Sequence, residues 1–101
     1  MGIPPLRVTD GPFGPRGPFS TGPASVLTPC GAALGATWDT ELIDRLGALL
    51  GQETRMKGAH ILLGPTVNLH RAPVTGRHFE CFSEDPCLTS QLGVAYIRGV
   101  Q

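Results

Sequence analysis

The sequence is most informative at residues 60–86, which read HILLGPTVNLHRAPVTGRHFECFSEDP. The first five residues of this stretch form a short apolar run that Pro65 ends. Such runs are typical of strands that are buried on both faces of a parallel sheet. The connector that follows concentrates charged and imidazole side chains: His70, Arg71, Arg77, His78, Glu80, Glu84 and Asp85. Charged residues gathered in a connector beside rigid elements are the usual composition of a polar ligand site.

An amphipathic helix is expected before this stretch, from about residue 40 to residue 57. Asp39 and Thr40 are good residues for its N-terminal cap. An apolar stripe with helical spacing follows, made of Leu42, Ile43, Leu46, Leu49 and Leu50. Lys57 and Gly58 fit its end, because a cation suits the last turn and glycine can take the left-handed cap conformation.

A second helix is expected after the connector. Ser83 or Asp85 can cap it, and Pro86 suits its first turn. One face of this helix then carries the apolar residues Leu88, Leu92 and Tyr96. The helical pattern runs on to residue 101 without a stop signal, so we expect the chain to be a fragment of a longer domain.

The N-terminal third is rich in glycine and proline. Residues 6–8 can form a short strand, which the turn sequence TDGP at residues 9–12 breaks. GPFGPRGPFSTGP, residues 11–23, has the composition of a disordered linker. Its two phenylalanines, Phe13 and Phe19, and the apolar residues that follow favour an ordered, irregular loop instead.

The order of these elements is strand, long loop, helix, strand, polar loop, helix. This alternation predicts an α/β architecture with parallel strands, containing about two β/α units and a long Gly/Pro-rich loop. Two strands make no stable parallel sheet and bury little apolar surface. Residues 1–101 are therefore expected to form an incomplete domain.

Composition excludes several classes of partner. The chain has 101 residues, is 41% hydrophobic, and balances eight basic against eight acidic residues. Nothing in its bulk charge attracts nucleic acid or anionic lipid, and no apolar run approaches the roughly 20 residues of a membrane helix. The sequence also lacks the pattern of a signal peptide, which favours the cytoplasm. The three cysteines, Cys30, Cys81 and Cys87, form no C-x-x-C motif and suit free thiols in a reducing compartment.

The candidate site lies where the two predicted strands end. In parallel α/β folds the functional loops leave the carboxyl ends of the strands. Asp10 follows the first predicted strand, and residues 71–80 follow the second. Ordinary structural roles are also open for these residues. Asp10 can be a turn former, Arg16 a solvated loop charge, and Arg77 with Glu80 a surface ion pair of small energetic value.

The sequence gives little support for a metal site, a nucleophilic cysteine or a nucleotide-binding loop. His70, His78 and Glu80 have no spacing typical of a metal site, and no neighbouring residue marks Cys30 or Cys81 as a nucleophile. The sequence contains neither a P-loop nor a G-x-G-x-x-G that opens a helix. We therefore expect no metal and no cofactor.

Three blocks of the sequence resemble the N-terminal domain of family 3 glycoside hydrolases, the β-glucosidase family. TDGPFGPRG, residues 9–17, is similar to the family pattern S/T-D-G-P-x-G-x-R-G. PCGAALGATWDTEL, residues 29–42, resembles P-x-G-x-A-L-A-A-T-W-D. Residues 57–86 resemble K-G-x-x-x-x-L-G-P-x-x-N-x-x-R-x-P-x-G-G-R-x-F-E-x-F-S-E-D-P. The departures are small: Val74-Thr75 replaces the commoner Leu-Gly, Cys81 stands where Ser or Cys is usual, and Pro15 is uncommon beside Arg16.

The resemblance implies a (β/α)₈ TIM-type barrel, followed by a second α/β domain, with sugar bound at the carboxyl face of the barrel. It implies a retaining hydrolase of β-glucosides or related oligosaccharides. The family residues that hold the terminal sugar fall on Asp10, Arg16 and Arg77 here. A carboxylate accepts hydrogen bonds from paired hydroxyls, while a guanidinium donates to sugar oxygens.

The resemblance also implies that the catalytic carboxylates are missing. The family's Lys-His pair, its nucleophile in a Ser-Asp-Trp-like motif and its acid/base match no residue of this chain. The chain is thus expected to supply part of a sugar subsite and no catalytic residue. A stand-alone sugar-binding module and a gene remnant are the alternatives, and the oligomeric state stays open.

Overall fold

The computed structural model describes residues 2–17 and 23–101, and its sheet has two parallel strands in that part of the chain. Strand β1 (Val8–Asp10) pairs with β2 (Ile61–Leu63) in the register Val8 to Ile61. The first strand begins two residues later than the predicted 6–8, because β2 offers partners only to residues 8–10. Asp10 is therefore the last residue of the strand rather than part of the turn after it.

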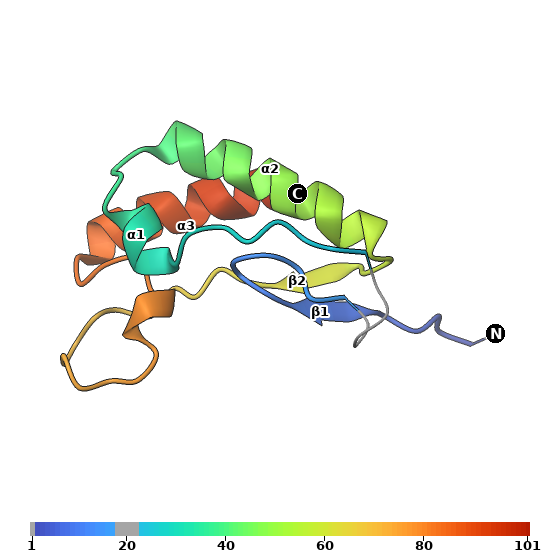
Figure 1. Cartoon of the computed structure of the whole chain (residues 1–101), viewed down its shortest axis with the longest axis horizontal. Helices are drawn as coiled ribbons and strands as arrows, with labels where there is room; N and C mark the ends of the chain where they lie inside the picture. The colour runs from blue at the N-terminus through green and yellow to red at the C-terminus, as the bar shows by residue number, and fades with distance from the viewer. Residues whose placement is uncertain (1, 18–22) are drawn as a thin grey trace.

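Two helices cover one face of this sheet (Figure 1). Helix α2 (Thr40–Met56) and helix α3 (Pro86–Val100) agree with the predicted bounds. The Asp39 carboxylate accepts a hydrogen bond from an amide in the first turn of α2. Of the two caps considered for α3, Asp85 is the one used, since its carboxylate accepts from two first-turn amides. None of the helices in residues 2–17 and 23–101 has the length and apolar character needed to cross a bilayer.

The apolar stripe of α2 is rotated relative to the prediction. Leu42 and Leu49 are exposed. The buried residues of the helix are Ile43, Gly47, Leu50, Gly51 and Thr54. Glycine is needed where α3 crosses, since a Cβ at position 47 would lie 2.5 Å from the Tyr96 carbonyl oxygen. Backbone proximity, rather than leucine periodicity, therefore sets the contact face.

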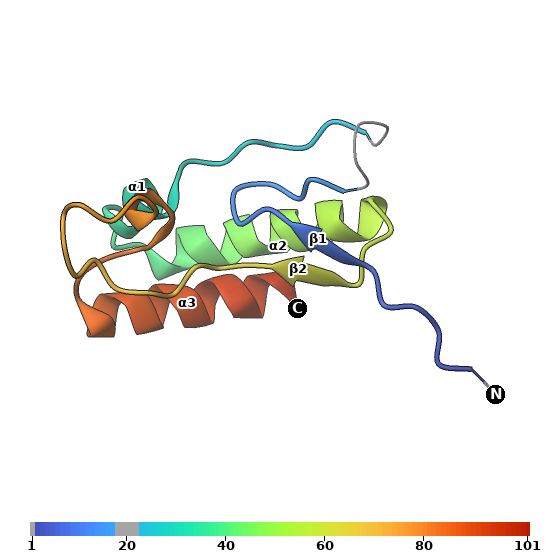
Figure 2. The same ribbon diagram turned by 90° about the horizontal axis from the view of Figure 1, so that it is seen from below.

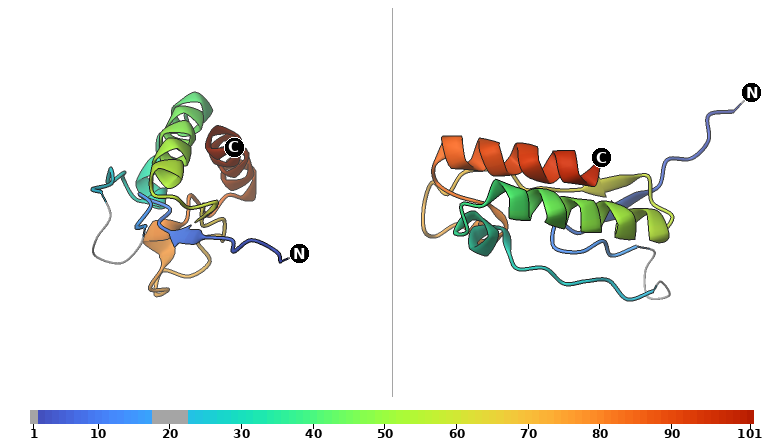
Figure 3. Two further views of the ribbon diagram at one scale, coloured as in Figure 1. Left: turned by 90° about the vertical axis from the view of Figure 1, so that its right-hand side faces the viewer. Right: turned by 90° about the horizontal axis from the view of Figure 1, so that it is seen from above.

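The end-on view in Figure 3 shows α2 and α3 side by side on one side of the strands, and most residues of the core come from these two helices. The core consists of Leu34, Ile43, Leu50, Phe82, Leu92, Ala95 and Tyr96. Thr9 of β1 is buried on the helix side, while the flanking Val8 and Asp10 are exposed on the opposite side. Ile61 and Leu63 of β2 are 42% and 51% exposed. The expectation of a strand buried on both faces is therefore wrong for this chain, because helices cover only one face.

The Gly/Pro-rich region is irregular but hydrogen-bonded where it is described. The Thr28 amide donates to the Phe13 carbonyl at 2.8 Å, and the Val26 amide donates to the Glu53 carboxylate. This agrees with the ordered loop that the sequence favours, although residues 18–22 of that prediction, including Phe19, lie outside the described residues. Residues 2–5 extend away from the helices and strands (Figure 2).

Two short helical elements were not expected from the sequence. Helix α1 (Gly31–Gly35) follows the long loop, and the 3-10 turn η1 (His78–Glu80) lies in the connector after β2. The two elements pack on each other, and a Cβ at Gly31 would lie 2.2 Å from the Glu80 carbonyl oxygen. Both lie toward the carboxyl ends of the strands, where Figure 1 shows them on one side of the molecule.

Candidate functional site

Asp10 ends β1, and the turn after it returns the chain toward its side chain. Gly11 has a φ of +133°, and a Cβ there would lie 1.9 Å from the Gly14 carbonyl oxygen. This conformation suits only glycine. The Arg16 amide then donates to the Asp10 carbonyl at 2.9 Å. As a result, the Arg16 Nε lies 3.6 Å from the Asp10 Oδ2, with both side chains open to solvent.

Arg77 lies in the connector after β2 and forms a two-point ion pair with Glu80. The Arg77 Nε donates to Oε1 at 3.0 Å, and its Nη2 donates to Oε2 at 2.7 Å. This hydrogen bonding raises the pKa of Arg77 and lowers the pKa of Glu80. The surface pair considered from the sequence is therefore present, and it keeps the Glu80 carboxylate ionised.

Backbone and imidazole hydrogen bonds fold the connector. The His70 Nε2 lies 2.8 Å from the His78 carbonyl oxygen and 3.0 Å from the Cys81 carbonyl oxygen. Since both oxygens can only accept, this nitrogen carries the proton and donates. The His70 amide donates to the Ser83 carbonyl, and Thr66 forms a parallel bridge with Cys81. His70 thus holds the loop together, and across residues 2–17 and 23–101 no cluster of three or more potential metal ligands occurs.

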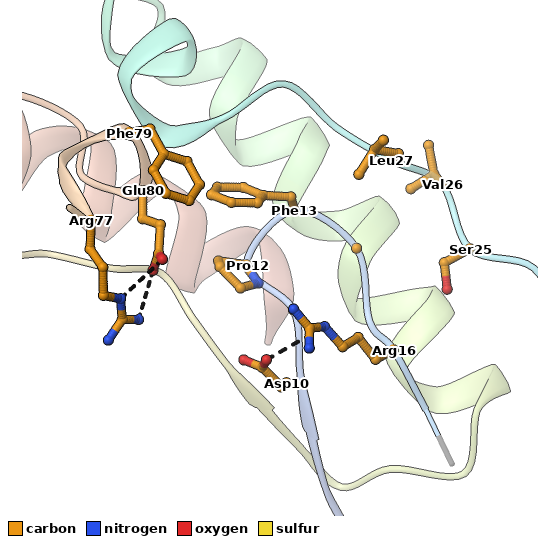
Figure 4. A pocket seen from close by; sticks show the side chains of 12 residues that line it. Asp10, Pro12, Phe13, Arg16, Ser25, Val26, Leu27, Arg77, Phe79 and Glu80 are labelled. Atoms are coloured by element: carbon orange, nitrogen blue, oxygen red, sulfur yellow. Dashed lines mark hydrogen bonds and ion pairs between the residues drawn. The ribbon is translucent and has the colours of Figure 1, made fainter. Parts of the chain in front are cut away.

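A cleft of about 530 Å³ lies at the carboxyl ends of the strands. Figure 4 shows the side chains that line it. Its walls are formed by Asp10, Gly11, Pro12, Phe13, Gly14, Arg16, Ser25, Val26, Leu27, Arg77, Phe79 and Glu80. The two ion pairs form the polar part of the cleft. The apolar part contains Phe13 and Phe79, whose ring centres lie 6.0 Å apart.

The structure brings together the three residues that the sequence singles out. Asp10, Arg16 and Arg77 all line this cleft, although Arg77 is more than 60 residues from the other two in the sequence. A carboxylate beside two guanidinium groups can accept from one set of hydroxyls and donate to another. Arg71, which belongs to the same connector, lines a different depression with His70 and is not part of the cleft.

Some residues that line the cleft could not be recognised from the sequence. For Glu80 the sequence suggests a surface ion pair with Arg77 or, less well, a metal ligand, and only the i, i+3 spacing from Arg77 marks the pair that the structure contains. Phe79 stands within a family motif, but no pattern in the sequence marks it as a residue of the cleft. Residues 25–27 carry no pattern that marks them, because the hydrogen bonds from Thr28 and Val26 bring them to the cleft only in the folded chain.

Comparison with known proteins decides the family. A model of the glycosyl hydrolase family 3 N-terminal domain matches residues 1–101. The chain belongs to glycosyl hydrolase family 3. Among relatives of this family 3 chain, the β-glucosidase of Rhizobium radiobacter is 55% identical over 103 residues, which cover 100% of this chain and 13% of the relative. The probable β-glucosidase J of Emericella nidulans is 53% identical over 102 residues, covering 100% of this chain and 12% of the relative.

Solved family 3 structures give the same result. The crystal structure of a β-glucosidase from Kluyveromyces marxianus in complex with glucose superposes with a TM-score of 0.92 at 44% identity, covering 99% of this chain and 12% of that one. The structure of β-glucosidase 3B from Thermotoga neapolitana in complex with α-D-glucose superposes with a TM-score of 0.91 at 36% identity. The match covers 99% of this chain and 15% of that one. The family 3 chain therefore spans about an eighth of the length of the curated relatives it matches.

Proposed function

We propose that this family 3 chain is part of a retaining β-glycosidase of the β-glucosidase type, which hydrolyses terminal β-linked sugars. The observation that carries the proposal is the cleft in which Asp10, Arg16 and Arg77 meet. It lies at the carboxyl ends of parallel strands, where α/β enzymes bind their substrates. Relatives named as β-glucosidases, and neighbours solved with glucose, support a glycoside as the substrate.

Each of the three residues has a distinct role in this proposal. The Asp10 carboxylate accepts hydrogen bonds from two hydroxyls of the terminal sugar. Arg16, 3.6 Å away, orients that carboxylate, and Arg77 donates to sugar oxygens from the opposite loop. Together they place the anomeric carbon for attack, since orientation of the substrate is itself a large contribution to rate.

The proposal also holds that this chain supplies neither the nucleophile nor the acid/base. A general acid of a glycosidase needs a raised pKa, whereas the Arg77 hydrogen bonds lower the pKa of Glu80. Asp10 is already assigned to hydroxyl binding and faces Arg16. Both catalytic carboxylates then come from other parts of the active enzyme, whose core is completed as a (β/α)₈ barrel.

Exposed apolar side chains support an enzyme piece over a self-sufficient sugar-binding module. Val8, Ile61 and Leu63 form an uncovered apolar face on the two strands. On the outer side of α3, Val94 and Ile97 are likewise exposed. Stable soluble modules rarely leave such faces open, because covering apolar surface is the main driving force for folding.

A chimera tests the proposal directly. Residues 1–101 replace the matching segment of the Rhizobium radiobacter β-glucosidase, where the identity of 55% over the whole chain allows a simple exchange. We expect the chimera to hydrolyse aryl β-glucosides, and we expect Arg16→Gln and Arg77→Gln to lower its kcat/KM. Arg45→Gln, in an exposed ion pair on α2, is the matched control. A folded chimera whose activity is indifferent to Arg16 and Arg77 would contradict the proposed roles.

A further inference from the structure

Glu80 and Arg77 are exposed to very different extents. The Arg77 side chain is 77% exposed, whereas the Glu80 side chain is only 15% exposed. The guanidinium therefore projects from the surface, and the carboxylate behind it is enclosed. Their two parallel hydrogen bonds fix the plane of the guanidinium as well as its position, because a forked pair allows little rotation.

Glu80 is itself held by three surrounding segments. Within η1 its amide donates to the Arg77 carbonyl at 3.2 Å. From α1, Gly31 packs so closely that a Cβ there would lie 2.2 Å from the Glu80 carbonyl oxygen. From the segment after β2, the Thr66 hydroxyl lies 3.5 Å from Oε2. These backbone contacts fix the position of Glu80 in the chain, and its carboxylate is then held between the Thr66 hydroxyl and the Arg77 guanidinium.

The ion pair leaves part of the guanidinium directed elsewhere. Glu80 engages Nε and Nη2, so the second amino group, Nη1, lies outside the pair. An arginine without a fixed carboxylate partner would sample several rotamers, and its N–H donors would point in a different direction in each. Figure 4 shows the pair at the wall of the cleft, on the side opposite Arg16.

From this geometry we infer that Glu80 is a positioning residue for substrate binding, which holds the Arg77 guanidinium in the orientation that contacts the sugar. The inference rests on the proposed function of Arg77. Glu80 itself contacts no sugar and acts only through its partner. It therefore extends the polar site from three residues to four and connects that site to α1 and η1.

A double-mutant cycle in the chimera tests the inference. The four proteins are the unmodified chimera, Glu80→Gln, Arg77→Lys and the double variant, each measured for kcat, KM and melting temperature on an aryl β-glucoside. Glutamine keeps the shape of the side chain but removes its charge. Glu41→Gln, an exposed carboxylate of α2, is the matched control. If Glu80→Gln does not accumulate as folded protein, Glu80→Asp, which keeps the charge, replaces it in the cycle.

The expected result is strong non-additivity. Loss of one charge-assisted hydrogen-bonded pair predicts about a 10- to 100-fold fall in kcat/KM for Glu80→Gln. The kcat/KM of Arg77→Lys should fall at least as far, and kcat and KM should change in the same proportion in both single variants. The kcat/KM of the double variant should equal that of Arg77→Lys. If Glu80 has only a structural role, Glu80→Gln should instead lower the melting temperature, and the losses of kcat/KM in the two single variants should multiply in the double variant.

Each other outcome has a definite meaning. If the losses multiply, or if Glu80→Gln leaves kcat/KM unchanged while Arg77→Lys lowers it, the positioning role is wrong and the proposed function stands. If Arg77→Lys itself leaves kcat/KM unchanged, both the role of Arg77 in sugar binding and the inference built on it are wrong.

Discussion

The hydroxyl of Tyr96 donates a 3.1 Å hydrogen bond to the backbone carbonyl of Pro12, 84 residues earlier in the chain. Tyr96 lies on α3 and is 1% exposed, and Pro12 lies in the turn that follows Asp10. This bond connects α3 to the turn that directly follows Asp10, the candidate sugar-binding carboxylate. The position of α3 therefore helps to fix the turn after Asp10.

Tyr96→Phe removes this connection without leaving a cavity. We expect it to reduce the free energy of unfolding by about 1 kcal/mol, the usual net value of one buried hydrogen bond. The Pro12 carbonyl loses its partner, so the turn after β1 becomes less well fixed, and a small rise in KM should accompany the change. Denaturant titration and steady-state kinetics of the chimera measure both effects. An unchanged unfolding midpoint would show that the bond contributes nothing.

The same tyrosine predicts a pH dependence in the alkaline range. Burial raises the pKa of Tyr96 from 10.0 to about 12. Because the folded-state pKa lies above the unfolded one, the stabilisation is complete below pH 10 and is lost as the pH rises toward 12. The stability advantage of the chimera over its Tyr96→Phe variant should therefore shrink between these values. An advantage that stays constant across this range would refute the burial argument.

The helix contact predicts a large effect at Gly99. A Cβ at this position would lie 2.0 Å from the Asp44 carbonyl oxygen of α2, so Gly99→Ala must push the two helices apart. We expect a loss of about 1–3 kcal/mol, typical of overpacking. Gly76→Ala is the matched control, because a Cβ added at that position would have no neighbouring atom within 4 Å. Equal melting temperatures for the two alanine variants of the chimera would mean that the helices do not approach this closely.

The isolated chain should be inactive on aryl β-glucosides. Hydrolysis with retention needs a nucleophile and a proton donor, and the proposed function assigns neither to this chain. Binding residues cannot replace that chemistry. The measurement is turnover by the purified chain against its Asp10→Ala variant. Turnover above that variant would place a catalytic carboxylate within residues 1–101.

Local signals predicted the helices well. The bounds of α2 followed from Asp39, a leucine-rich stripe and Gly58, all of which act within one or two turns of the helix. Helix α1 could not be predicted from local sequence, because it is defined by its packing against the connector after β2. A Cβ on Gly35 would lie 1.9 Å from the Phe82 carbonyl oxygen, so its glycines serve close packing against the connector.

The site was predictable only in part, for a similar reason. Asp10, Arg16 and Arg77 stand in motifs, and strand order alone placed two of their loops at one edge of the sheet. The role of Glu80 depends on the packing of its backbone against Gly31 of α1, which no spacing in the sequence reveals. The one-sided burial of β2 likewise depends on which elements are present to cover it.

Asp10 is proposed to bind sugar hydroxyls rather than merely to form a turn, and the decisive test is the Asp10→Ala substitution in the chimera. Two charge-assisted hydrogen bonds lost in the transition state predict a fall in kcat/KM of roughly 10²–10⁴-fold. The melting temperature should stay close to that of the parent, since the side chain is exposed and its removal leaves no cavity. Glu41→Ala controls for the loss of a surface carboxylate. Unchanged kcat/KM together with a lowered melting temperature would contradict the claim and leave Asp10 as a turn former.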